Sequence, residues 1–141
     1  ATVHGLLMGR EEDCPMRALL VDDSAIMRMM LRSLLDQVDI RDVIEAGDGT
    51  EGLRALSEHD IDVILLDLHM PEMDGIAFLT RRNQTPKLSR IPVIVISSDS
   101  EQAQIEEARA LGAAAYVTKP FTLDGLEAAL SAVSTNDTSS H

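Results

Sequence analysis

Short runs of apolar residues alternate along the chain with longer stretches in which apolar residues recur at helical spacing. The runs predict five strands, at 18–21, 42–46, 63–66, 93–96 and 115–118. The other stretches predict five helices, at 26–38, 50–59, from 74 onward, 100–111 and 122–133. Strands that alternate with helices indicate a doubly wound α/β fold, in which helices cover both faces of a five-stranded parallel sheet.

Local signals predict where several helices begin and end. Ser24 is a suitable N-cap for the first helix, and Gly112 a suitable C-cap for the fourth. The apolar stripe of the third helix is interrupted at Arg82 and Asn83, which predicts an early end to that helix. In the first helix, Met27, Met29 and Met30 are expected to fill the core; a copper or cofactor role is the weaker interpretation.

Unusual polar residues stand where the predicted strands end. Asp22 and Asp23 follow the first strand, Asp67 the third, Ser97 the fourth and Lys119 the fifth. In a parallel sheet the carboxyl ends of the strands lie at one edge, and ligands bind there. The three acids, the hydroxyl and the lysine are therefore expected to meet.

This set of side chains favours phosphoryl chemistry. Two carboxylates 4 Å apart repel by about 4 kcal/mol at an effective dielectric of about 20, so a cation is needed. Mg²⁺ suits oxygen ligands, Lys119 supplies a second positive charge and Ser97 a hydroxyl donor. With these groups stabilising a phosphoryl group, Asp67 would attack it in line and become an aspartyl phosphate.

Taken singly, each of these features has a plainer interpretation. Acids at a strand end are usually solvated, and a lone strand tyrosine such as Tyr116 is usually half-buried. The histidines are scattered, which disfavours a transition-metal site. A flavodoxin-like cofactor or hydrolase domain is an alternative, but its first loop should be rich in glycine or hydroxyl groups, whereas this chain has Asp22 and Asp23.

Composition narrows the class of protein further. A chain of 141 residues, 45% hydrophobic, suits one domain at 16–134, with a flexible extension at 1–15 and a polar tail at 135–141. A net charge of -12 disfavours direct nucleic-acid binding. The single Cys14 allows no internal disulfide, and no apolar run suggests a signal peptide or membrane insertion. A cytoplasmic protein is expected.

Five motifs in order carry a resemblance to a known family. They are Asp22-Asp23-Ser24, Asp67 at a strand end, Met70-Pro71 with Asp74-Gly75, Ser97, and Lys119-Pro120-Phe121. Over roughly Met16 to Val133 the chain resembles the receiver domain of bacterial two-component response regulators. The resemblance implies the flavodoxin/CheY-like fold with strand order 2-1-3-4-5.

The resemblance also implies roles for individual residues. Asp67 would accept phosphate from a sensor histidine kinase. Asp22 or Asp23, with Asp67 and the backbone carbonyl of His69, would bind Mg²⁺, or Mn²⁺ in its place. Lys119 would pair with phosphoryl oxygens, in front of a cis bond to Pro120.

The switch positions of the family fall on Ser97 and Tyr116, and the small Ser98 should leave Asp67 accessible. The fourth helix, fifth strand and fifth helix would form the face that binds a target. His69 and Arg82 depart from the common pattern, which bears on the phosphate lifetime and on the end of the third helix.

The implied protein is a signalling module that assists its own phosphorylation and dephosphorylation, and not an enzyme with an external substrate. The segment from Asp23 to Arg28 is similar to chemotaxis receivers, so a motor or other output protein is the leading expectation for its target. A phosphate sink or relay, and a receiver that belongs to a longer regulator, stay open as alternatives.

Overall fold

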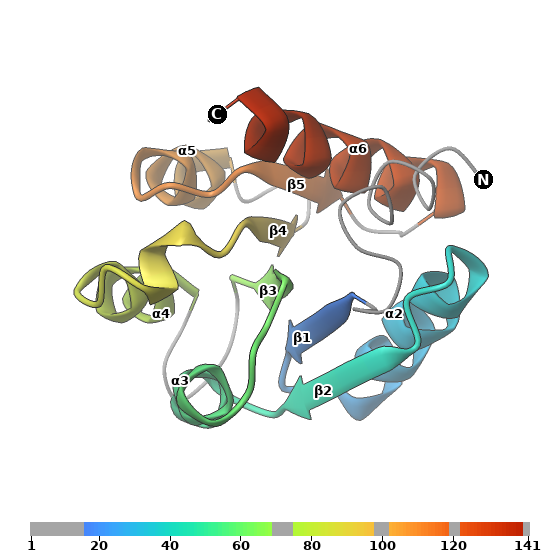
Figure 1. Cartoon of the computed structure of the whole chain (residues 1–141), viewed down its shortest axis with the longest axis horizontal. Coiled ribbons are helices and arrows are strands. Elements are labelled where there is room, and N and C mark those ends of the chain that lie inside the picture. The colour runs from blue at the N-terminus through green and yellow to red at the C-terminus, as the bar shows by residue number, and fades with distance from the viewer. Residues whose placement is uncertain (1–15, 69–74, 98–101, 119–121, 140–141) are drawn as a thin grey trace.

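The computed structural model describes residues 16–68, 75–97, 102–118 and 122–139, with side chains up to residue 133. Its elements in chain order are β1 (Arg17–Val21), α2 (Ala25–Gln37), β2 (Asp42–Ala46), α3 (Gly49–Glu58), β3 (Val63–Asp67), α4 (Gly75–Asn83), the 3₁₀ turn η1 (Leu88–Arg90), β4 (Val93–Ser97), α5 (Gln102–Ala110), β5 (Ala115–Thr118) and α6 (Leu123–Ser139). The strands form one parallel sheet in the order β2-β1-β3-β4-β5 (Figure 1). The predicted fold and strand order are confirmed.

The core consists of two apolar layers, one on each face of the sheet. Alternate residues of a strand point to opposite faces, so Leu20 packs in the layer under α2 and α6, and Leu19 in the layer under α3, α4 and α5. Leu35 of α2 and Leu130 of α6 are fully buried in the first layer, and Phe78 of α4 is fully buried in the second. Burial on both faces explains why β3 and β4 are continuously apolar.

The strand register brings the carboxyl ends of the strands to one rim. Val21 at the end of β1 pairs with Ala46 of β2 and Leu66 of β3. Asp67 at the end of β3 pairs with Ile96, one residue before the end of β4. The residues that directly follow these positions therefore lie close to one another at this rim of the sheet.

Two of the predicted caps are present. The Ser24 side chain accepts a hydrogen bond from the Met27 N–H at 3.3 Å and so caps α2. Gly112 has φ +106°, the left-handed conformation of a helix C-cap, and the N–H groups of Gly112 and Ala113 bond back to Arg109 and Ala108. These bonds end α5 and turn the chain into β5.

The structure corrects three local predictions. Met29 and Met30 of α2 are exposed, because the helix turns those positions away from the sheet. Arg82 does not interrupt the packing of α4, because its side chain is buried, although the helix does end early, at Asn83, as predicted. The last helix continues to Ser139 and not only to Val133, since 134–139 contain no glycine or proline to stop it.

Some local predictions fall outside the described residues. They concern the extension at 1–15, the part of the loop between β3 and α4 that includes His69, and the cis bond between Lys119 and Pro120. Among the described residues, no helix combines the length and the apolar character needed to cross a membrane.

Candidate functional site

Three carboxylates meet at the rim of the sheet. Asp22 and Asp23 directly follow β1, and Asp67 ends β3; one carboxylate oxygen from each lies within 4.8 Å of the others. Asp22 and Asp67 are almost fully buried, at 1% and 3% exposure, whereas Asp23 is exposed. The predicted grouping of these acids is therefore present, with one side open to solvent.

Backbone bonds hold Asp22 in place. Its N–H donates to the carbonyl of Ala46 at the end of β2, at 3.1 Å. Its Oδ1 accepts a bond from the Ser24 N–H at 2.9 Å. The turn that carries the acids is thus fixed both to the sheet and to the first residues before α2.

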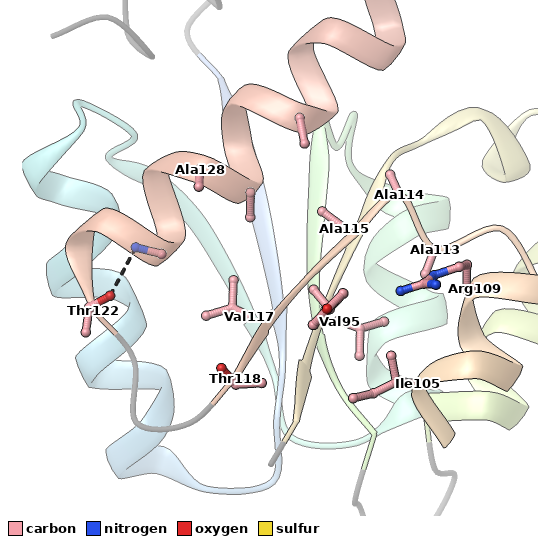
Figure 2. A pocket seen from close by; sticks show the side chains of 14 residues that line it. Val95, Ile105, Arg109, Ala113, Ala114, Ala115, Val117, Thr118, Thr122 and Ala128 are labelled. Carbon is pink, nitrogen blue, oxygen red and sulfur yellow. Dashed lines mark hydrogen bonds between the residues drawn. The ribbon is translucent and has the colours of Figure 1, made fainter. Parts of the chain in front are cut away.

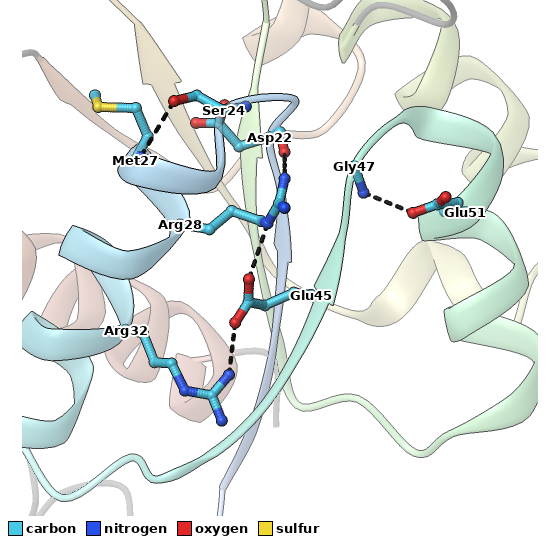
Figure 3. Close-up of polar contacts among 8 residues, drawn as sticks. All are labelled: Asp22, Ser24, Met27, Arg28, Arg32, Glu45, Gly47 and Glu51. Carbon is cyan, nitrogen blue, oxygen red and sulfur yellow. Dashed lines mark hydrogen bonds and ion pairs between the residues drawn. The ribbon is translucent and has the colours of Figure 1, made fainter.

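Arg28 of α2 supports the same turn and was not singled out by the sequence as a site residue. Its guanidinium donates to the backbone carbonyl of Asp22 and to Glu45 of β2 at 2.9 Å (Figure 3). Arg32 donates to the other oxygen of Glu45 at 2.8 Å. Because side chains of a helix lean toward its N-terminus, an arginine one turn into a helix can reach the preceding strand end. That position is the signal that could have identified Arg28.

Ser97 lies next to the acids in the sheet, and Tyr116 lies farther out. Ser97 ends β4, is fully buried, and its Oγ has no hydrogen-bond partner among the described residues. Tyr116 lies on β5 opposite Val95 and is 47% exposed. The structure thus brings Ser97 to the rim but directs Tyr116 to the surface.

Four predicted site positions lie outside the described residues: His69, Ser98, Lys119 and Pro120. Lys119 follows Thr118, the last residue of β5, directly in the sequence.

The three acids fit a small hard cation. Three negative charges within 4.8 Å of one another repel by about 3 kcal/mol or more per pair at an effective dielectric of about 20. All donors in the group are carboxylate oxygens, which suits Mg²⁺ and not a metal that prefers nitrogen or sulfur. A cation here would offset the repulsion and attract an anionic oxygen to the open side.

A pocket of about 650 Å³ lies beside β5, between α5 and α6 (Figure 2). Small side chains form much of its wall, among them Ala113, Ala128 and Ala132. Arg109 and Tyr116 are also part of its lining. The pocket therefore lies on a surface that α5, β5 and α6 form together.

Comparison with known proteins identifies the class. The family model described as the response regulator receiver domain matches residues 18–131. The chain therefore belongs to the response regulator receiver domain family and is a CheY-like signalling module of two-component systems.

Individual relatives agree with this class. The chain is 32% identical over 117 residues to the probable chemotaxis protein CheY of Rhizobium etli, covering 83% of this chain and 91% of that protein. It is 35% identical over 112 residues to chemotaxis protein CheY of Pseudomonas aeruginosa, covering 79% and 90%.

Solved structures agree as well. Chemotaxis protein CheY4 of Vibrio cholerae superposes with a TM-score of 0.77 at 28% identity, covering 84% of this chain and 98% of that one. The receiver domain of a signal transduction histidine kinase from Syntrophus aciditrophicus superposes with a TM-score of 0.75 at 28% identity, covering 85% and 90%.

Proposed function

We propose that this protein receives a phosphoryl group on Asp67 from a sensor histidine kinase and changes its affinity for a target protein when it does so. The observation that carries this proposal is the group formed by Asp22, Asp23 and Asp67 at the carboxyl ends of the strands. Membership of the receiver family supports it.

Asp67 is the proposed nucleophile because it ends a strand buried on both faces, which fixes its position. A carboxylate oxygen forms a bond to phosphorus as the bond from phosphorus to the donor's histidine nitrogen breaks. The electron pair of the broken bond stays on that nitrogen. Because the other ring nitrogen of the phosphohistidine carries a proton, the products are an aspartyl phosphate and a neutral imidazole.

The proposed metal is Mg²⁺, or Mn²⁺, held by Asp22, Asp23, Asp67 and the backbone carbonyl of His69. When bound, the ion neutralises charge on the phosphoryl oxygens. Arg28 keeps the β1 turn, and therefore Asp22, in position through the Asp22 carbonyl. Lys119 and Ser97 are proposed to pair with phosphoryl oxygens from the other side, with Ser98 leaving access open.

The proposed output face consists of α5, β5 and α6, with Tyr116 as the residue that changes position. Ser97 supports this because its buried Oγ has no partner among the described residues and is free to turn toward a phosphoryl oxygen. The chemotaxis relatives favour a motility protein as the target. We place the receiver unit at 16–134 and the protein in the cytoplasm.

The test is intact mass spectrometry after incubation with acetyl phosphate, a small phosphodonor that replaces the kinase. The wild type and Asp60→Asn should gain the mass of one phosphoryl group, and only with Mg²⁺ present. Asp60 is the matched control because it is an exposed aspartate just before β3. Asp67→Asn should gain nothing, and a chelator should abolish the gain in the wild type.

Two results would contradict the proposal: modification of Asp67→Asn to the wild-type extent, or no modification of a folded wild type that binds Mg²⁺.

A relay role is the second candidate, favoured by the likeness to the receiver domain of a histidine kinase. A relay intermediate passes its phosphoryl group onward to another histidine. Rapid loss of the phosphoryl mass on adding a histidine phosphotransfer protein would support this role over target binding.

A further inference from the structure

We propose that Arg109 on α5 holds Tyr116 in its outward position and thereby sets how readily the output face switches. This inference rests on the proposed function, because it concerns the regulation of the same face. It assigns a positioning role to Arg109 and no contact with the phosphoryl group.

The contact itself is a cation over an aromatic ring. The Arg109 Cζ lies 5.7 Å from the centroid of the Tyr116 ring. That separation is within the range at which a guanidinium is attracted to the face of a ring. The tyrosine is exposed, so the arginine meets the ring in its outward position and stabilises that position.

Among the described residues, the other side-chain contact of Arg109 is a weak ion pair. Its NH1 lies 3.7 Å from Glu106 Oε2, one turn earlier on α5, and both side chains are more than half exposed. Ion pairs of this length at the surface contribute little. The ring of Tyr116 is therefore the contact of Arg109 that orders its guanidinium among the described residues.

The pocket offers the Tyr116 ring a second, inward position. Tyr116 lines the pocket beside β5, together with Thr118, which lies on the same side of the strand two residues further along. Thr118 pairs with Ser97 in the sheet register. An inward turn of the ring would thus follow β5 from Tyr116 toward the buried Ser97 hydroxyl, past Val95 and Thr118, which line the same pocket (Figure 2).

The ring is therefore in equilibrium between an outward and an inward position, and the contact with Arg109 favours the outward one. A cation over a ring at an exposed site shifts such a balance by about two- to fivefold. Loss of the cation should raise the share of inward rings in the resting protein by that factor. If inward rings favour the phosphorylated form, phosphorylation should become faster by about the same factor.

The Tyr116 ring can be observed by itself, since Tyr116 is the single tyrosine and there is no tryptophan. Intrinsic fluorescence therefore reports on this ring alone. Quenching by acrylamide measures its exposure, and acrylamide is neutral, so a change of charge beside the ring does not alter the local quencher concentration. The measurement uses the unphosphorylated full chain.

Arg109→Gln keeps the length of the side chain and removes its charge. It should lower the quenching constant of Tyr116, and Arg109→Lys should give an intermediate value. Glu106→Gln removes the ion pair and keeps the stacked arginine, so it should match the wild type. Equal quenching in Arg109→Gln and the wild type would overturn the proposal, as would an equal fall in Glu106→Gln.

The two proposals can fail separately. Ring exposure is measured without phosphate, so a fall in Arg109→Gln would support the role of Arg109 even if Asp67 proved not to be the acceptor. Conversely, a phosphorylated Asp67 with no change of ring exposure in Arg109→Gln would leave the proposed function standing and reject Arg109.

Discussion

Arg82, near the end of α4, is a buried arginine that donates hydrogen bonds to the backbone of the segment before β4. Its guanidinium donates to the carbonyls of Ser89 and Ile91, at 3.0 and 2.7 Å, and to Asn83 Oδ1 at 2.6 Å. Asn83 in turn donates to the carbonyl of Leu111 at 2.7 Å. Burial lowers the pKa of Arg82, although a guanidinium stays charged under all ordinary conditions. The pair joins the end of α4 to the segments that precede β4 and β5.

The aliphatic part of the Arg82 side chain should stabilise the fold more than its charged guanidinium does. Arg82→Ala removes buried packing and should lower the free energy of unfolding by about 2–3 kcal/mol. Arg82→Met keeps the packing and should cost less than about 1 kcal/mol. The reason is that Ser89 is exposed and Ile91 only half-buried, so water can reach both carbonyls. Urea unfolding measures both variants.

The exposed neighbour Arg81 gives the control, and Arg81→Ala should change stability by less than about 0.5 kcal/mol. A loss in Arg82→Met as large as that in Arg82→Ala would show that the hydrogen bonds, and not the packing, stabilise this region.

Among the glycines that the structure describes, Gly75 at the start of α4 has the closest neighbours. A Cβ on Gly75, the first residue of α4, would lie 2.8 Å from Leu68 Cα and 2.9 Å from the Asp67 carbonyl oxygen. The Gly75 N–H also bonds to the Leu68 carbonyl at 3.2 Å. The helix therefore begins in contact with the backbone that carries Asp67.

Gly75→Ala should move α4 away from the end of β3 and displace Asp67. We expect a loss of about 1–3 kcal/mol in the free energy of unfolding and slower modification by acetyl phosphate in the protein that remains folded. Unfolding in urea and the rate of mass gain measure the two effects.

Gly47→Ala is the matched control, because the nearest atom to its added Cβ would be a flexible glutamate oxygen at 3.5 Å. It should leave both quantities close to the wild type. A wild-type rate and stability in Gly75→Ala would show that this close approach does not position the acid.

For the whole molecule, periodicity predicted most of the buried positions and the succession of strands and helices along the chain. The strands β2 and β5 have the predicted bounds, and Asp22, Asp23 and Asp67 meet as expected. Strand ends at one rim follow from parallel pairing alone, which is why the acids could be placed without a structure.

Contacts made by long side chains could not be predicted in this way. A helical stripe shows which residues share a face but not how far the neighbouring elements cover it, so Met29 and Met30 were wrongly assigned to the core. Arg28 and Arg82 reach carbonyls that are distant in sequence or in another segment. Charge alone does not reveal such partners.

The most direct test of the account is to locate the phosphoryl group. After modification with acetyl phosphate and Mg²⁺, borohydride reduces an acyl phosphate to an alcohol and leaves free carboxylates unchanged, so the modified aspartate becomes homoserine. Peptide mass spectrometry then identifies the position. We predict homoserine at Asp67 alone; homoserine at Asp22, Asp23 or any other acid, with Asp67 unchanged, would contradict the account.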